Sequence, residues 1–415
     1  MFLDDKEFLH NYDGPELRIM EVCGTHTAAI FKNGIRSFLS PKIRLVSGPG
    51  CPVCVTVPDY IDRCVEICLN PGFELLCFGD LLKVPGTERT LSDAKGAGGR
   101  VRMVWSPFDA LALVEREPET VFVVAAIGFE TTAPAFGLLI EEAEARGVQN
   151  IRLLTSLKSA LAAIDWVCAA GEAIDAFLCP GHVSVVTGAD AYKPLAEKYG
   201  KPFVVAGFEG EHLMAAIRAA AEDAAEGRGG VRNLYPEAVS AAGNTKAREV
   251  TDRFFRSGGA EWRGLGRVAR SGYYLREEYQ EFGIEAEVSG LGLGQEDDNT
   301  VGIEAGGTVS GLNTEGTSLC VAEGTSLCVA SSRFAAARND GEARDDGEAS
   351  QYGEACNDGE ARNDGEACGC RCGDVILGRI DPTGCSLFGN ACTPAHPVGP
   401  CMVSAEGACG CWYRL

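Results

Sequence analysis

Residues 120–145 read TVFVVAAIGFETTAPAFGLLIEEAEA, which is an apolar run, a loop from Gly128, and an amphipathic segment. The same succession recurs in the first 225 residues: LRIMEV (17–22) leads to CGTHT, IRLVS (43–47) to GPGCPVC, AIDAFLC (173–179) to PGHVS, and KPFVVA (201–206) to GFEGEH. Short apolar strands that alternate with helices are typical of parallel sheets covered on both faces. The sequence therefore predicts an α/β protein.

The length of this region predicts two Rossmann-like lobes with parallel sheets, residues 1–118 and 119–230, divided at the charged segment EREPET (115–120). In such folds, ligands bind beyond the carboxyl ends of the strands. Most residues of unusual chemistry follow a predicted strand: Cys23, His26, Cys51, Cys54, Glu130, His182 and Glu209. We therefore expect these residues to share one cleft between the lobes.

The rest of the chain divides into three segments by composition. Residues 231–289 are predicted to be a helical connector, with one helix over about 234–256 and a short one further on. Residues 290–367 form an acidic low-complexity insertion with a tandem EGTSLCVA (315–330) and five six-residue units that end in GEA (338–367). The six-residue units lack the bulky apolar residues that a core needs, so we expect the insertion to be disordered. Residues 368–415 are a cysteine-rich region that needs a metal or covalent organiser.

Charge and compartment narrow the possible functions. A formal net charge of −22 repels nucleic-acid backbones and anionic membranes, so we expect neither as a partner. The N-terminus lacks the apolar run of a secretory signal and no stretch has the length of a transmembrane span, so the cytoplasm is expected. Because that compartment is reducing, the 19 cysteines favour metal, cluster or redox roles.

The C-terminal cysteines are the strongest signal for a metal centre. Six of them lie in a compact segment rich in Gly and Pro: Cys370, Cys372, Cys385, Cys392, Cys401 and Cys409. Four thiolates that converge from loops hold either an iron–sulfur cluster or a tetrahedral zinc ion. The spacings between these cysteines are longer than those in the CxxC pairs of a zinc ribbon, and this favours a 4Fe–4S cluster. A zinc site and unliganded cysteines remain the alternatives.

Two motifs near the N-terminus each admit two interpretations. The CPVC motif, Cys51 to Cys54, precedes a predicted helix and is either a redox pair with a lowered thiol pKa or a buried thiol pair in a tight turn. In CGTHT, Cys23 and His26 either share a metal or a proton, or act as a helix cap and a packed histidine.

The remaining motifs are weaker when each is taken alone. GFETT, with Glu130, Thr131 and Thr132, is typical of a helix cap with an acidic residue in the first turn. His182 in PGHVS and Glu209 in GFEGEH are, individually, more typical of structural residues.

Together, the motifs closely resemble those of the HypD family of nickel–iron hydrogenase maturation proteins. The resemblance covers about residues 15–280 and 368–413 and is carried by EVCGTHT, SGPGCPVCVT, GFETTAP, PGHVS, GFE and the run from CGCRCGDVILG to CSLFGNACTPAHPVGPCMVSAEGAC. The resemblance implies that the protein is a cytoplasmic scaffold. Such a scaffold helps to assemble the Fe(CN)2CO centre before this centre enters the hydrogenase large subunit. The implied partners are a small chaperone, HypC, and a cyanide donor, HypE, which HypF loads.

The resemblance also implies roles for individual residues. Cys23 would bind iron with His26 beside it, and Cys51 and Cys54 would be the redox pair. C-terminal cysteines would hold the 4Fe–4S cluster, and we favour four drawn from Cys370, Cys372, Cys385, Cys392 and Cys401. The other site residues are expected to line the cleft or to handle ligands and protons: Glu130, Thr131, Thr132, His182 and Glu209.

Two features depart from the family pattern. The repeats lie upstream of the cluster cysteines and add Cys320, Cys328, Cys356 and Cys368, and Cys411 stands where a different residue is expected. We expect the insertion to have no role. The alternative function is a stand-alone iron–sulfur-dependent disulfide reductase that uses Cys51 and Cys54, and a third possibility is a zinc-stabilised binding module.

Overall fold

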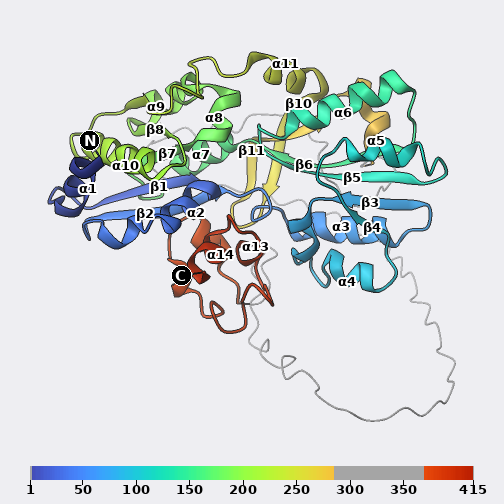
Figure 1. Cartoon of the computed structure of the whole chain (residues 1–415), viewed down its shortest axis with the longest axis horizontal. Helices are drawn as coiled ribbons and strands as arrows, with labels where there is room; N and C mark the ends of the chain where they lie inside the picture. Colours follow the sequence, from blue (N-terminus) through green and yellow to red (C-terminus); the bar gives the residue numbers. More distant parts are fainter. Residues whose placement is uncertain (1, 285–368, 415) are drawn as a thin grey trace, which may run out of the picture. The chain divides into compact units, whose positions relative to one another are not determined.

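The structure is a computed structural model that describes residues 2–284 and 369–414 (Figure 1). The predicted acidic insertion lies outside the described residues, together with Cys320, Cys328, Cys356 and Cys368. The strands of the described residues form two sheets, and helices pack against both, so the predicted α/β class is confirmed.

The first sheet is entirely parallel and has the strand order β2-β1-β7-β8-β9. Its strands are β1 (Leu17–Cys23), β2 (Ile43–Gly50), β7 (Ala176–Pro180), β8 (Pro202–Ala206) and β9 (Gly230–Asn233). Every residue of β7 and β8 is buried. Burial on both faces explains why these strands are continuous apolar runs rather than alternating ones.

The second sheet has the order β10-β11-β6-β5-β3-β4. Four of its strands are parallel: β3 (Phe73–Cys77), β4 (Val101–Met103), β5 (Val121–Gly128) and β6 (Ile151–Lys158). The antiparallel hairpin of β10 (Phe255–Trp262) and β11 (Gly266–Leu275) extends the sheet by pairing β11 with β6. The stretch that begins at Thr120 therefore forms a central strand, β5, as its apolar run predicts.

Helices connect the strands and cover the sheets, as Figure 1 shows for α3 and α4 on one side of the second sheet and α5 and α6 on the other. The α-helices are α1 (Phe2–Asn11), α2 (Gly24–Lys32), α3 (Pro58–Leu69), α4 (Leu91–Gly96), α5 (Asp109–Val114), α6 (Ala133–Arg146), α7 (Ala160–Ala169), α8 (Gly181–Thr187), α9 (Lys193–Tyr199), α10 (Gly210–Ala225), α11 (Thr245–Phe254), α12 (Cys372–Ile376), α13 (Pro400–Val403) and α14 (Ala408–Tyr413). Short 3-10 helices are η1 (Ile35–Phe38), η2 (Gly79–Lys83), η3 (Ala189–Tyr192), η4 (Glu277–Phe282) and η5 (Pro382–Gly384).

The two sheets do not follow the division at residue 118 that the sequence suggested. The chain forms β1 and β2, crosses to the second sheet for β3 to β6, returns for β7 to β9, and crosses again for β10 and β11. As a result, the CGTHT, GPGCPVC, PGHVS and GFE loops all belong to the first sheet, and GFETT belongs to the second. Local sequence patterns specify strands but not their pairing partners, which are distant along the chain.

The structure differs from the predicted helical connector over 231–289, of which it describes residues 231–284. Within those residues the only α-helix is α11, which begins at Thr245 rather than near residue 234. The hairpin of β10 and β11 takes the place of the expected linker, and the 3-10 helix η4 lies in the stretch where a short helix was expected. Gly258 and Gly259 weaken the local strand signal within β10, and pairing of β11 with β6 supplies stabilisation that no local pattern contains.

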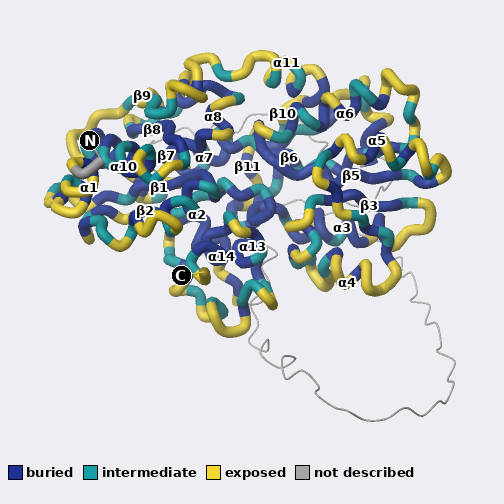
Figure 2. Tube along the Cα trace, in the orientation of Figure 1, coloured by how far each residue is buried: buried dark blue, intermediate teal, exposed yellow. Residues whose placement is uncertain are grey.

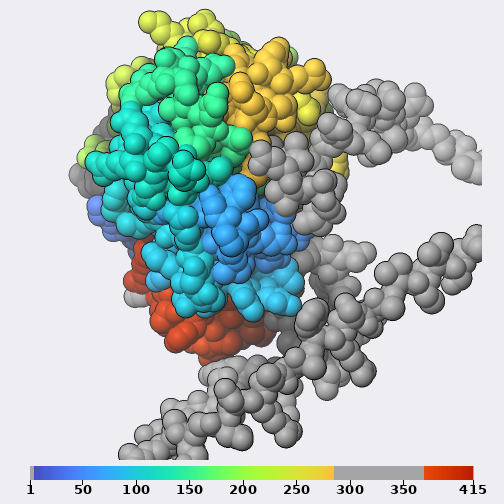
Figure 3. Space-filling model, turned by 90° about the vertical axis from the view of Figure 1, so that its right-hand side faces the viewer, coloured from blue at the N-terminus to red at the C-terminus, as the bar shows by residue number. Residues whose placement is uncertain are grey.

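The cysteine-rich C-terminal region packs onto the rest of the described chain rather than forming a core of its own. Its buried residues, such as Cys401 and Ile376, belong to the same hydrophobic cluster as Val46 in β2 and Leu75 in β3. Buried positions continue from the strands into this region in Figure 2, and Figure 3 shows the region (red) against the blue and cyan parts of the chain.

Polar contacts reinforce this attachment at the first sheet. The Arg18 guanidinium donates to the Gly378 carbonyl at 2.6 Å, and Arg44 forms an ion pair with Asp381 at 3.0 Å. The region thereby obtains part of the organisation that its own sequence cannot supply.

Candidate functional site

A cavity of about 150 Å³, which we call the cleft, lies where the ends of β1, β2 and β7 meet the end of β5. Residues from both sheets and from the C-terminal region line it: Val22, Cys23, Thr25, Gly50, Pro52, Phe129, Thr131, Thr132, Ala160, Pro180, His182, Val183 and Glu406. Its position at the carboxyl ends of parallel strands is the one expected for a ligand site in this fold class.

Cys23 is the last residue of β1 and the N-cap residue of α2. Its side chain lines the cleft although the residue is only 8% exposed. Burial raises the pKa of the Cys23 thiol, against the opposing effect of hydrogen bonds from Thr25 and from the backbone N–H of His26. The thiol is therefore protonated in the absence of a metal, and the N–H groups of the helix N-terminus face the sulfur that a metal would deprotonate.

Gly50 forms the wall opposite Cys23. The two residues are cross-strand partners at the ends of β2 and β1. A Cβ atom on Gly50 would overlap the backbone of Val22 and Cys23, so the close approach of the two strands requires glycine.

Four polar side chains surround the thiol across the cleft. Thr131 and Thr132 come from the loop after β5, and His182 is an exposed residue at the start of α8. The His182 ring stacks on Phe208 with 4.1 Å between ring centres. Glu406 comes from the C-terminal region and accepts a hydrogen bond from the Thr25 hydroxyl at 2.7 Å. Two hydroxyls, an imidazole and a carboxylate therefore line the same cavity as one thiol.

Five residues that the sequence placed in the cleft do not line it: His26, Cys51, Cys54, Glu130 and Glu209. His26 is fully buried, and its Nε2 lies 3.2 Å from the Ala206 carbonyl oxygen at the end of β8. Burial lowers the pKa of His26 to about 4, so the imidazole is neutral. Glu209 is exposed and forms the N-cap of α10. The structure does not bring either side chain to the cleft with Cys23.

Glu130 lies between its cleft-lining neighbours Phe129 and Thr131, but its own carboxylate lines a second cavity of about 170 Å³. It accepts hydrogen bonds from the Ser159 hydroxyl at 2.8 Å and from the Ala160 backbone N–H at 3.2 Å. Burial raises the pKa of the Glu130 carboxyl. The residue therefore anchors the N-terminus of α7 and supports the GFETT loop.

Cys51 and Cys54 form a disulfide, with Cα atoms 5.3 Å apart, in the turn that follows β2. Both residues are buried, and the Cys54 backbone N–H donates to the Cys51 sulfur at 3.3 Å. The next helix, α3, begins only at Pro58, so the pair is not at a helix N-terminus as the sequence suggested. The helix dipole weakens beyond the first turn, so it is not the cause of any activation of this pair.

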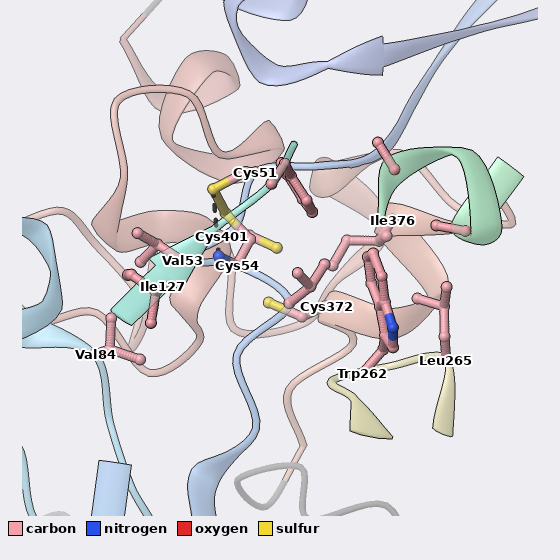
Figure 4. Packing of buried hydrophobic residues seen from close by; sticks show 14 of the residues in the cluster. Cys51, Val53, Cys54, Val84, Ile127, Trp262, Leu265, Cys372, Ile376 and Cys401 are labelled. Carbon is pink, nitrogen blue, oxygen red and sulfur yellow. Dashed lines mark hydrogen bonds between the residues drawn. A yellow bond between two sulfur atoms is a disulfide. The ribbon is translucent and has the colours of Figure 1, made fainter. Parts of the chain in front are cut away.

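The disulfide lies between the cleft and the cysteine-rich region. On one side, Cys51 directly follows Gly50, the partner of Cys23, and Pro52 lines the cleft. On the other side, the Cys54 sulfur is 3.8 Å from the carbonyl oxygen of Pro400, the residue before Cys401. Figure 4 shows Cys401 and Cys372 beside the disulfide.

A third cavity, which we call the cysteine pocket, holds the C-terminal thiols. It is small, about 10 Å³, and five cysteines line it: Cys370, Cys372, Cys385, Cys392 and Cys409. Cys401 is fully buried beside it, and its interactions with Cys372 and Cys409 raise its thiol pKa. Hydrogen bonds with Cys372 and Cys401 lower the pKa of Cys409 below that of an ordinary thiol.

The donor set of the cysteine pocket suits an iron–sulfur cluster by its chemistry. Within residues 2–284 and 369–414, no group of three or more His, Cys, Asp or Glu side chains is placed so that it could hold a metal ion. The lining of the pocket nevertheless includes five cysteines and no histidine or carboxylate, and the Val398 backbone N–H donates to the Cys392 sulfur at 3.3 Å, a contact of the kind that tunes cluster ligands. Gly399 faces the pocket, and a Cβ atom there would lie 2.5 Å and 2.6 Å from the sulfurs of Cys370 and Cys372.

Two residues in these cavities were absent from the site predicted by sequence. Cys409 lines the cysteine pocket but lay outside the favoured set of five. Glu406 enters the cleft from SAEGAC, and no pattern in that segment links it to β1. Cys411, by contrast, donates from its thiol to the Ala405 carbonyl at 3.2 Å and does not line the pocket.

Comparison with known proteins agrees with this arrangement of motifs. A family model named HypD, described as "Hydrogenase formation hypA family", matches residues 6–317 and 345–415.

None of the helices in the described residues combines the length and the apolar composition that a membrane span requires.

Three similar proteins illustrate the relationship. Hydrogenase maturation factors HypD of Azotobacter vinelandii and of Escherichia coli K12 are each 36% identical over 406 residues, covering 96% of this chain and 89% of the relative. A putative hydrogenase expression/formation protein of Methanocaldococcus jannaschii is 33% identical over 399 residues, covering 96% of this chain and 92% of the relative.

Proposed function

Because the chain belongs to the HypD family of hydrogenase maturation factors, we propose that it is a scaffold and redox protein for assembling the Fe(CN)2CO centre of nickel–iron hydrogenases. The iron is the cargo, and Cys23 is its ligand in this chain. The observation that carries the proposal is the position of Cys23, which lines an accessible cleft and is paired with the residue that precedes the Cys51–Cys54 disulfide.

The surroundings of Cys23 suit the capture of iron. Iron that carries cyanide and carbon monoxide favours a soft thiolate ligand. Binding replaces the thiol proton by the metal and releases that proton into the cleft, where His182 and Glu406 are the titratable side chains nearby. The N–H groups at the start of α2 then stabilise the sulfur in its thiolate form.

The disulfide supports a redox role. Its reduction takes up two electrons and two protons and yields the two thiols of Cys51 and Cys54. We assign the thiols of the cysteine pocket, together with Cys401, as the source of the four ligands of a 4Fe–4S cluster. When bound, such a cluster supplies single electrons, which an external one-electron donor protein replaces. The chain's own contribution is to hold Cys54 against the segment that carries Cys401.

Partners complete the scheme. A small HypC-type chaperone contributes a second thiolate to the iron, and a HypE-type donor, loaded by a HypF-type protein, delivers cyanide. The hydrogenase large subunit receives the finished centre, and we place the assembly in the cytoplasm. The exposed position of His182 at the rim leaves one side of the cleft accessible to a partner's side chain.

Infrared spectroscopy tests the proposal. The chain is purified anaerobically with its small chaperone, and the cyanide and carbon monoxide bands are recorded for wild type, Cys23→Ala and Cys168→Ala. Cys168 is also a buried cysteine, but it lines neither the cleft nor the cysteine pocket. We expect the bands in wild type and Cys168→Ala and their loss in Cys23→Ala.

Persistence of the bands and of hydrogenase maturation in Cys23→Ala would remove Cys23 from the mechanism. If the chain instead turns over thioredoxin-like disulfides without a chaperone, and carries no such bands, the alternative of a stand-alone disulfide reductase is the better description.

A further inference from the structure

Two cationic side chains are buried at the tip of the β10–β11 hairpin, which contacts the loop that carries Cys51 and Cys54 (the dithiol loop). Lys158, the last residue of β6, is 3% exposed, and Arg263, between β10 and β11, is 2% exposed. Lysine and arginine are almost never fully buried unless they are paired, because a charge loses its hydration in the interior. Their burial therefore requires compensation from nearby negative charge or aligned dipoles.

The tip of the β10–β11 hairpin brings both cations to this place. The Arg263 backbone N–H donates at 2.9 Å to the carbonyl of Val55, the residue after Cys54. The Lys158 ammonium donates at 2.8 Å to the Glu261 carbonyl and lies 5.5 Å from the centre of the Trp262 ring. Both cations are thus anchored within one short stretch, residues 261–263, that touches the dithiol loop.

The same tip also contacts the cysteine-rich region. Gly264 has φ +82°, and a Cβ atom there would fall against the backbone of Gly373, which follows Cys372. Figure 4 shows Trp262 and Leu265 on the side of Cys372 and Ile376, with the disulfide beyond. The tip therefore contacts both the disulfide loop and the cysteine-rich region.

Neither cation forms an ion pair within the described part of the chain. The Arg263 guanidinium donates to the Pro85 carbonyl at 3.1 Å. The Glu261 carboxylate is 41% exposed and pairs with Arg267 at 3.7 Å, although its charge also acts to raise the pKa of Lys158. Burial lowers the pKa of Lys158 to about 8, which leaves the ammonium charged at neutral pH. Carbonyl dipoles, the Trp262 ring and the charge of Glu261 are the groups that offset these two positive charges while Cys51 and Cys54 are joined as a neutral disulfide.

Reduction adds negative charge when one of the two protons is not retained. A disulfide is neutral, but uptake of two electrons and one proton leaves one thiol and one thiolate, and a nearby cation stabilises the thiolate. Fixed charges act strongly in the interior because the effective dielectric constant is low. We propose that Lys158 and Arg263 are positioning residues whose fixed charges shift the equilibrium of Cys51 and Cys54 towards the reduced pair. The inference rests on the proposed redox function of this pair and adds a means of setting its potential.

The test measures the thiol–disulfide equilibrium of the full chain. Wild type, Lys158→Met and Arg263→Met are equilibrated anaerobically in mixtures of reduced and oxidised glutathione, thiols are trapped by alkylation, and peptides containing Cys51 and Cys54 are quantified by mass spectrometry. The control is Lys193→Met, which removes a 57% exposed lysine paired with Asp190. We expect each buried substitution to lower the equilibrium constant for reduction about tenfold, equivalent to about 30 mV for a two-electron couple, and the control to leave it unchanged.

Two further variants separate charge from packing and remain informative if a methionine variant fails to fold. Arg263→Lys retains the charge and should keep the wild-type equilibrium, whereas Lys158→Gln retains an N–H donor without the charge and should show the shift. The proposal is overturned if the charge-free variants match wild type, or if Arg263→Lys shifts as far as Arg263→Met. A wild-type disulfide that glutathione mixtures and stronger dithiols fail to reduce would instead overturn the redox role under "Proposed function".

Discussion

Cys23 and Gly50 face each other as the final cross-strand pair of β1 and β2. Cys51 is the residue after Gly50, so this pair connects the proposed iron ligand to the disulfide through a single peptide unit and the strand pairing. The glycine permits the approach, because any Cβ atom at residue 50 would overlap the backbone of β1. The geometry of the cleft therefore depends on a residue that has no functional group.

Substitution of that glycine should disturb the cleft. Gly50→Ala forces β1 and β2 apart, and we expect a loss of about 1–3 kcal/mol in the free energy of unfolding together with reduced hydrogenase maturation. Denaturant unfolding and a maturation assay measure the two effects. Gly96→Ala is the control, since a Cβ atom there meets nothing within 4 Å. Equal behaviour of the two variants would show that the close approach is unimportant.

The cysteine pocket should be equally sensitive to added volume. In Gly399→Ala, the new methyl group displaces the sulfurs of Cys370 and Cys372, and we expect a loss of iron and acid-labile sulfide per chain. Gly384→Ala lies in the same region, but its Cβ atom would be 3.4 Å from the nearest atom of Ile380, an ordinary contact. Elemental analysis and visible absorption after anaerobic reconstitution compare the two. Full cluster content in Gly399→Ala would mean that the thiols around this glycine do not hold the cluster.

Acid should destabilise the fold through His26. Its pKa is lowered from 6.5 to about 4 by burial, so between these values the unfolded state binds a proton that the folded state does not. The contribution of neutral His26 to stability is complete above pH 6.5 and is lost as the pH falls, by about 1.4 kcal/mol per unit down to about pH 4. Unfolding free energies measured across this range should therefore fall less steeply in His26→Asn.

His10→Asn serves as the control for this effect, because His10 is an exposed histidine in α1. It should retain the steeper wild-type dependence. Identical slopes in wild type and His26→Asn would indicate that the folded protein accepts the proton at His26.

Removal of the repeats should have little effect. The five six-residue units in residues 338–367 are rich in Asp, Glu and Gly and lack the bulky apolar residues of a core. We therefore expect a chain without 315–367 to mature hydrogenase almost as well as wild type, with equal iron content. A severe loss of maturation at normal cluster content would instead assign the repeats a role in partner binding.

The structure bears out the sequence-based expectation where the signal is local. The apolar run of residues 120–128 predicts a strand, and β5 occupies Val121–Gly128. Cys23 and His182 each follow a predicted strand, and both line the cleft. A parallel strand buried on both faces reads as an apolar run that a loop terminates, and this pattern needs no knowledge of neighbours.

The prediction of a shared cleft fails where it depends on the direction in which a side chain points and on the residues that it contacts. His26 lies three residues beyond Cys23, and the helical path of α2 turns its ring into the protein, towards Ala206. Glu130 is adjacent to Thr131, but its carboxylate faces Ser159 and a different cavity. Successive side chains of a turn point in different directions, so neighbours in sequence need not share a site.

The sequence by itself determined the α/β class, the loops that carry the reactive residues, and membership of the family, because each depends on short patterns along the chain. Only the tertiary structure decided that β2 pairs with β1, that Glu406 reaches the cleft, and that the hairpin tip with its two buried cations contacts the loop of the disulfide. These relationships join residues that are distant along the chain. They arise when the whole chain buries its apolar surface at once, which no local segment encodes.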